Sequence, residues 1–141
     1  MRILGQLHEG RIIPDNSLKI SAHCNRVPVI DGHMACVSVK FAGRKPSIEE
    51  VIKIWKYFVG DPQRLKLPFA PEHAIIYREE VDRPQPRMDR DAGNGMAVTV
   101  GRLRECNVFD YRFAGLSHNT VRGAAGGAIL TAEFLKAKGY F

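Results

Sequence analysis

One stretch decides the fold class: it runs from Pro46 to Gly60 and reads PSIEEVIKIWKYFVG. Ser47 and Glu50 have the spacing of a capping box, in which each side chain accepts the backbone amide of the other residue. Gly60 can end the helix. Apolar residues recur between these limits at helical spacing: Ile48, Val51, Ile52, Trp55 and Phe58. The stretch therefore predicts one amphipathic helix that lies over a sheet, with Trp55 in the core.

Five other segments are predicted as strands because they are rich in apolar residues with partial alternation. They are 19–24, 33–41, 74–77, 96–103 and 108–116. Residues 105–107 would form the hairpin turn between the last two, and the prolines of 62–85 indicate an ordered connector laid across a surface. A second helix is predicted from about 120 to 138, ended by Gly139. This order favours the α+β class, a mixed or mostly antiparallel sheet with helices on one face.

The composition is that of one ordinary globular domain. The chain has 141 residues, of which 45% are hydrophobic and 26% charged, and this excludes a disordered chain or a coiled coil. No apolar run approaches the roughly 20 residues of a membrane span, and no signal-peptide pattern is visible. We therefore expect a cytoplasmic protein that does not bind membranes.

The net charge of +6 raises the question of nucleic-acid binding. The basic residues are scattered, and in 83–90 arginines alternate with acidic residues, so we expect no nucleic-acid partner. Cys24, Cys36 and Cys106 are an odd number without close pairs, which is typical of a reducing compartment. No short Cys or His pair has zinc-ligand spacing, so we expect no metal site.

The first candidate site is the stretch 24–33, which reads CNRVPVIDGH. Arg26 and His33 are seven residues apart, which would place them on opposite faces of a regular strand. One extra residue in a bulge at Asp31-Gly32 would bring both side chains to the same face, where they could share a pocket. An arginine can hold a carboxylate with two parallel hydrogen bonds, and a histidine titrates near neutrality and can move a proton. The same residues also fit a structural interpretation, in which Arg26 pairs with Asp31 and His33 caps a turn.

The second candidate site is the stretch 117–128, where Gly123 to Gly127 are all small. Glycines cost helix stability, so this run indicates close approach of another backbone or of a ligand. Asn119 or Thr120 would cap the helix and leave free amides at its positive end. Tight packing against a second domain is the structural alternative.

A third stretch, 82–96, carries alternating charges. It could bind an anion, but an ion-paired loop at a subunit interface is the interpretation that the pattern favours.

Together the three stretches resemble aspartate-semialdehyde dehydrogenase of the archaeal and fungal type, in the order of that family and over about residues 3–135. The resemblance implies a C-terminal part of a longer enzyme, with the α+β fold of glyceraldehyde-3-phosphate dehydrogenase-like C-terminal domains. The family reduces L-aspartyl 4-phosphate with NADPH to aspartate semialdehyde and phosphate, in amino-acid biosynthesis. An N-terminal Rossmann domain binds NADP and supplies a cysteine nucleophile.

The resemblance also implies roles for individual residues. Arg26 matches the arginine that binds the substrate carboxylate, and His33 matches the acid–base histidine. Asn119, with Thr120 beside it, matches the position that meets the nicotinamide end of NADP. Residues 1–117 would be the sheet-and-helix layer of one catalytic and dimerisation domain, and 118–141 a helix that returns to the absent Rossmann domain. The partners implied are that domain, an acyl phosphate substrate and other copies of the chain, in a dimer or tetramer.

The cysteines depart from the family pattern, in which the nucleophile follows Asn and precedes Ser or Thr. Cys24, Cys36 and Cys106 do not fit this pattern, and we expect Cys24 and Cys36 to be core thiols. The isolated chain should therefore be inactive, with NADP bound mainly by the N-terminal domain. Two alternatives stay open: a relative of the malonyl-CoA reductase type, and a non-catalytic oligomerisation module that binds no NADP.

Overall fold

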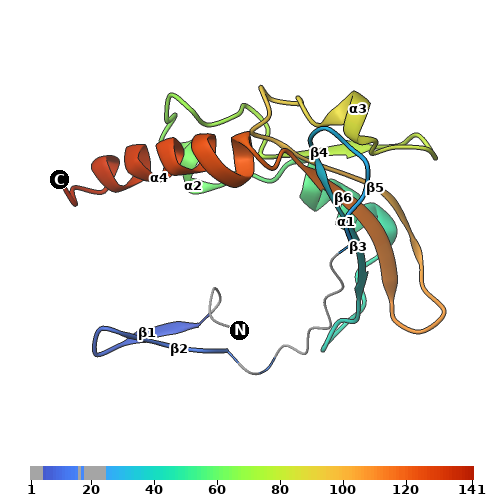
Figure 1. Cartoon of the computed structure of the whole chain (residues 1–141). Helices are drawn as coiled ribbons and strands as arrows, with labels where there is room; N and C mark the ends of the chain where they lie inside the picture. The colour runs from blue at the N-terminus through green and yellow to red at the C-terminus, as the bar shows by residue number, and fades with distance from the viewer. Residues whose placement is uncertain (1–4, 16, 18–24) are drawn as a thin grey trace.

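The computed structural model describes residues 5–15, 17 and 25–141. Its centre is a four-stranded sheet with the order β3-β6-β5-β4 (Figure 1). The strands are β3 (His33–Val39), β4 (Ile75–Arg78), β5 (Val98–Glu105) and β6 (Tyr111–Ser117). β6 pairs antiparallel with β3 and β5, whereas β4 pairs parallel with β5. The sheet is therefore mixed, and the predicted α+β class is confirmed; the strand expected at 19–24 lies outside the described residues.

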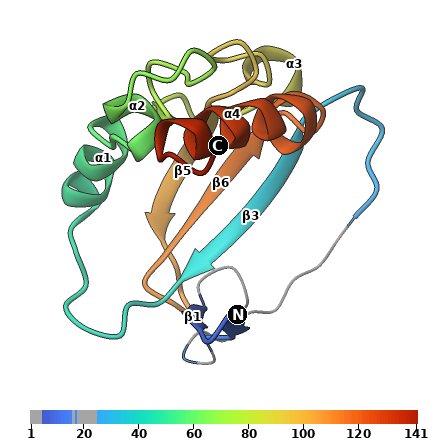
Figure 2. The ribbon, with the colours of Figure 1, turned by 90° about the vertical axis from the view of Figure 1, so that its left-hand side faces the viewer.

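Five helical segments accompany this sheet in the described part of the chain. They are α1 (Ile48–Lys56), α2 (Asp61–Arg64), α3 (Pro86–Asp89), the π-helical turn η1 (Val121–Ala125) and α4 (Gly126–Ala137). Figure 2 shows α2, α3 and α4 gathered at one end of the sheet, with α1 to the side. At this end β3 and β5 begin and β6 ends. Within the described residues, no helix has the length and apolar character that crossing a membrane requires.

Helix α1 has the start that the sequence predicts, but it ends earlier. The Glu50 amide donates to Ser47 Oγ at 3.2 Å, and the Ser47 amide donates to Glu50 Oε2 at 2.7 Å. Trp55 packs as expected on two aromatic rings of the sheet, those of Tyr77 and Phe113, at centroid distances of 5.9 and 5.0 Å. Gly60 does not end this helix, because its amide is bound by the Gln63 side chain at the start of α2.

The proline-rich stretch contains β4, and the charged segment that follows β4 packs closely against β5 at Gly101. A Cβ at Gly101 would lie 2.6 Å from the Arg83 carbonyl oxygen, so only glycine lets the segment approach this closely. Asp89 is 1% exposed and binds the side chains of Arg78 and Arg83 and the Gln85 amide. The predicted ion pairing is thus present within the chain, while a subunit interface here stays a prediction.

Helix α4 is tied to the body by an apolar cluster. Leu67, Met96 and Leu130 are buried together, with Phe134 packed against them. The helix ends close to the expected position, and Gly139 follows it with φ +77°.

A hairpin near the N-terminus has no counterpart in the sequence-based expectations. It consists of β1 (Gln6–His8) and β2 (Arg11–Ile13), whose six residues are all exposed. Glu9 and Gly10 connect them with φ of +48° and +74°, as a tight two-residue hairpin turn requires. Its strands are too short for an alternating pattern to stand out.

Candidate functional site

The end of the sheet that carries the helices also brings two of the predicted site stretches together. His33, the first residue of β3, is paired with Ser117, the last residue of β6. Asn119 follows two residues later, and its Oδ1 accepts the Gly32 amide at 2.7 Å. The turn before the predicted acid–base residue is therefore bound directly to the predicted cofactor residue, across 87 positions of sequence.

Gly32 is enclosed on three sides. Its φ is +106°, and an added Cβ would lie 3.1 Å from Leu116 Cδ1, 3.2 Å from Pro86 Cβ and 3.5 Å from Arg90 Cβ. Both the backbone angle and the surrounding atoms therefore require glycine at this position. The position of Gly32 is therefore fixed, and it determines the position of the His33 backbone that follows it.

The predicted alignment of Arg26 with His33 on one bulged strand is wrong. Residues 25–32 form an irregular segment in which the Val29 amide binds the Val27 carbonyl oxygen at 2.9 Å, and both Arg26 and His33 are exposed. The physical reason is that β6 ends at Ser117, so nothing in the described sheet pairs with the chain before His33. A parity argument does not apply where there is no ladder.

The start of the last helix also differs from the prediction. The side chains of Asn119 and Thr120 do not cap it; His118 does, because its Nδ1 accepts the amides of Thr120 at 3.3 Å and Val121 at 3.4 Å. With Nδ1 as acceptor, the ring proton is on Nε2, which lies 3.6 Å from Asp91 Oδ1. The ring is 7% exposed. Its spacing from Val121 is that of a cap, but histidine is not a preferred capping residue, so the sequence signal was weak.

The small residues 123–127 allow a wide helical turn and close packing of the helix backbone against neighbouring atoms. The Gly123 amide donates to the His118 carbonyl oxygen and the Ala125 amide to that of Thr120, which gives the wide π-helical turn. At the start of α4, directly after this turn, a Cβ at Gly127 would lie 2.5 Å from the Arg122 carbonyl oxygen, and one at Gly126 2.5 Å from Met96 Sδ. Such turns are frequent at functional sites.

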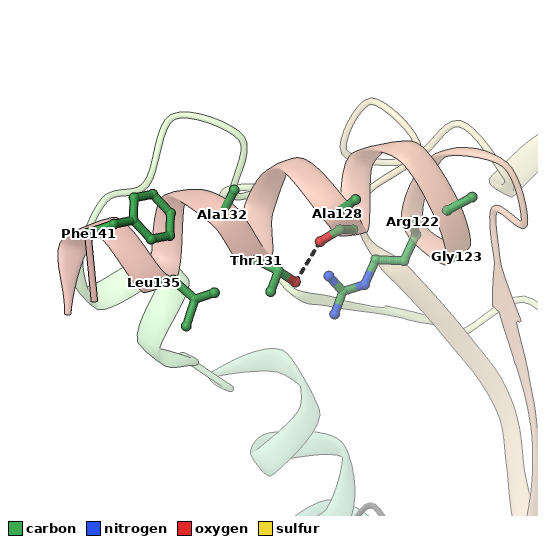
Figure 3. A pocket seen from close by; sticks show the side chains of 9 residues that line it. Arg122, Gly123, Ala128, Thr131, Ala132, Leu135 and Phe141 are labelled. Carbon is green, nitrogen blue, oxygen red and sulfur yellow. Dashed lines mark hydrogen bonds between the residues drawn. The ribbon is translucent and has the colours of Figure 1, made fainter. Parts of the chain in front are cut away.

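The opposite side of the same helix bears an open hollow of about 630 Å³ (Figure 3). Arg122, Thr131 and Leu135 line it together with small residues, and Phe141 closes one end. Neither Arg26 nor His33 lines it. Its wall of glycine and alanine would allow another surface to approach the helix backbone closely.

The two cysteines in the described part of the chain do not face His33. Cys36 lies three residues along β3, so its side chain is on the opposite face, and it is exposed, which makes the expectation of a core thiol wrong. The reason is that β3 is an edge strand, and no described element covers the face on which Cys36 lies. Cys24 lies outside the described residues. Amides of Phe109 and Val108 lower the pKa of the Cys106 thiol, but Cys106 lies beyond Tyr111, roughly 20 Å of strand from Ser117.

No group of three or more His, Cys, Asp or Glu side chains in the described ranges is placed to hold a metal ion. Of the residues predicted for the site, hydrogen bonding in the described part of the chain joins Asn119 to the turn before His33. An acyl-transfer reaction at this end would need a thiol from elsewhere.

Comparison with known proteins identifies the family. A family model described as "Semialdehyde dehydrogenase, dimerisation domain" matches residues 1–122. The aspartate-semialdehyde dehydrogenase of Candida albicans is 49% identical over 127 residues, which are 89% of this chain and 35% of that protein. The enzyme of the same name from Archaeoglobus fulgidus is 50% identical over 135 residues, covering 96% of this chain and 38% of the relative.

Solved structures agree with these matches. The crystal structure of the Candida albicans aspartate-semialdehyde dehydrogenase with NADP superposes with a TM-score of 0.87 at 45% identity, over 99% of this chain and 40% of that chain. Aspartate-semialdehyde dehydrogenase II of Vibrio cholerae gives 0.61 at 27% identity, over 82% of this chain and 30% of that one. The archaeal and fungal resemblance is confirmed, and the chain spans between 30% and 40% of the length of these relatives. It belongs to the semialdehyde dehydrogenase dimerisation-domain family.

Proposed function

We propose that this chain is the C-terminal catalytic and dimerisation part of an NADP-dependent aspartate-semialdehyde dehydrogenase. The complete enzyme would convert L-aspartyl 4-phosphate to L-aspartate 4-semialdehyde and phosphate. The observation that carries the proposal is the joining of the His33 turn to Asn119, in a chain about half identical to enzymes of that name. Because those relatives are named for aspartate semialdehyde, we favour aspartyl phosphate over malonyl-CoA as the acyl donor.

In this reaction His33 moves protons. It would take the proton of the thiol that attacks the acyl phosphate, and that thiol belongs to the N-terminal part of the enzyme. His33 is exposed at the beginning of β3, so its imidazole is accessible to a group from outside this chain. Arg26, also exposed, would bind the substrate α-carboxylate through its two-pronged guanidinium group.

Asn119 and Thr120 would hold the nicotinamide end of NADP, which supplies hydride when bound. The residues fit such a contact: the Asn119 oxygen is occupied by the Gly32 amide, so its Nδ2 is turned elsewhere and can donate to a carbonyl oxygen. Most of the cofactor would be bound by the N-terminal Rossmann domain. A reaction that depends on a free thiol suits a reducing compartment, so we place the enzyme in the cytoplasm.

The division of the chain follows from this assignment. Residues 1–117 would form the layer that contacts a second copy in a dimer or tetramer. Residues 118–141 would return to the Rossmann domain, and the hollow lined by Arg122, Thr131 and Leu135 is the surface we assign to that contact. Under the alternative of a non-catalytic oligomerisation module, the chain would dimerise without any effect of His33 on activity.

The test uses the complete enzyme that contains this chain. Purified enzyme is assayed for phosphate- and NADP-dependent oxidation of aspartate semialdehyde, and for NADPH oxidation with aspartyl phosphate and with malonyl-CoA. His33→Ala should lower kcat by roughly 10² to 10⁴-fold, while the exposed histidine variant His73→Ala keeps its rate. Near-normal turnover of His33→Ala would remove the assigned role, and preference for malonyl-CoA would change the substrate.

A further inference from the structure

The hydrogen bond between Asn119 and Gly32 fixes which way the Asn119 amide faces. A backbone N–H can only donate, so the atom 2.7 Å from the Gly32 nitrogen must be Oδ1. The Asn119 side chain is half-buried, and within the described residues its Nδ2 has no hydrogen-bond partner. The two ends of this amide therefore differ: the oxygen is bound inside the chain, and the nitrogen has no partner among the described residues.

The oxygen controls the residue that precedes His33. Gly32 is buried and held between Leu116, Pro86 and Arg90, and its amide is bound by Asn119 Oδ1 immediately before the ladder starts. A buried amide without an acceptor is costly, so loss of Oδ1 would favour a rearranged turn. Because the pair of His33 with Ser117 is the last of the β3–β6 ladder, that rearrangement would act directly on His33.

We propose that Asn119 is a positioning residue for His33, acting through the Gly32 amide, in addition to any contact with the cofactor. This inference rests on the proposed function, since it assumes that His33 is the acid–base residue. Small displacements of catalytic groups have large effects on rate, and a misplacement of about 1 Å can cost 10²-fold. The oxygen should therefore influence kcat, and the nitrogen the KM for NADPH.

The experiment separates the two ends of the amide in the complete enzyme. Asn119→Asp keeps an acceptor for Gly32 and loses the donor, whereas Asn119→Leu loses both with little change of size. We expect kcat to fall roughly 10- to 100-fold in Asn119→Leu and clearly less in Asn119→Asp, whose KM for NADPH rises because the donor is lost. Asn107→Leu, at an exposed asparagine of the β5–β6 turn, is the matched control with unchanged kinetics. Equal kcat losses in the Leu and Asp variants would overturn the inference.

A double mutant distinguishes this failure from failure of the proposed function. If Asn119 acts through His33, then adding Asn119→Leu to His33→Ala should lower kcat by no more than about twofold further. Effects that multiply would show that Asn119 acts independently, and the inference would fall while the role of His33 stands. A His33→Ala enzyme with normal turnover would instead remove the proposed function.

Amide hydrogen exchange of Gly32 gives a readout that needs no activity. Its exchange in the ligand-free enzyme should be at least about tenfold faster in Asn119→Leu than in wild type, and close to wild type in Asn119→Asp. If Asn119→Leu does not fold, Asn119→Ser replaces it, because the serine hydroxyl is too short to reach the Gly32 amide. Unchanged exchange in the variant without an acceptor would overturn the proposal.

Discussion

The two ends of the β3–β6 pair are held by different kinds of contact. At the His33 end, a half-buried amide and a buried imidazole bind backbone groups, Asn119 to Gly32 and His118 to the helix start. At the other end, exposed Lys45 and Glu105 pair at 2.5 Å, with side chains 39% and 64% exposed. Buried polar groups need specific partners, whereas exposed ones have water as an alternative. The chemistry that we assign to this chain lies at the end that tolerates the least displacement.

The largest expected difference is in the stability lost on replacing buried Asp89 and exposed Glu105. Asp89→Ala leaves two arginines near a buried site without their carboxylate, and should lower the free energy of unfolding by about 3–5 kcal/mol. Glu105→Ala removes an exposed pair and should leave the urea midpoint almost unchanged. Urea unfolding followed by fluorescence of Trp55 measures both. Similar losses would mean that burial does not distinguish the two regions.

The same carboxylate makes stability depend on pH. Burial raises the pKa of Asp89, but hydrogen bonds from Arg83 and the Gln85 amide outweigh it and hold the pKa below its ordinary value. A lowered folded-state pKa gives stability that is full above the unfolded value of about 3.9 and is lost as the pH falls through the folded value. The difference in unfolding free energy between wild type and Asp89→Asn should therefore shrink below about pH 4. A constant difference from pH 6 to pH 2.5 would contradict this.

Gly32→Ala is expected to have the next largest effect. Its φ of +106° and the contact of a new Cβ with Leu116 should cost about 2–3 kcal/mol and displace His33. Gly43→Ala is the matched control, because an added Cβ there would meet no atom within 4 Å and the φ of Gly43 is not positive. Thermal unfolding and kcat of the complete enzyme measure the two consequences separately. If Gly32→Ala is as stable as wild type, the turn can rearrange to accept the new Cβ, and the expected loss is contradicted.

Local signals account for what the sequence could predict. The start of α1 depends on Ser47 and Glu50, three residues apart, and β5 and β6 are neighbours in sequence; neither requires knowledge of the rest of the fold. The connection is 106–110, longer than the predicted turn at 105–107. The class of the sheet follows from the order of such elements. The end of α1 was less predictable, because Gly60 serves the next helix through Gln63.

The site depended on contacts that are distant in sequence. The motifs containing His33 and Asn119 could be selected, but the bond from Asn119 to Gly32 spans 87 residues and competes with the capping role that local spacing suggests. The predicted alignment of Arg26 with His33 on one strand failed because β6 ends at Ser117, a fact about the partner strand. The exposure of Cys36 likewise depends on which face of β3 is covered, and its own sequence carries no sign of that.

The smallest expected effect concerns His118. His118→Ala removes the acceptor for the amides of Thr120 and Val121 and should cost about 1 kcal/mol, the usual value of a helix cap. His118→Asn offers a side-chain oxygen to the same amides, so it should recover much of that loss. Thr131→Ala, which removes an exposed side-chain bond to the Gly127 carbonyl oxygen inside α4, should change little.

Thermal unfolding and hydrogen exchange of the amides of 120–125 distinguish two explanations for His118. If Nδ1 is what matters, exchange is faster in the Ala variant and slower again in the Asn variant. If the Ala and Asn variants lose equal stability, packing of the ring against Gly95 is what holds the start of the helix. In that case buried shape, and not a buried acceptor, would distinguish this end of the sheet from the exposed end at Glu105.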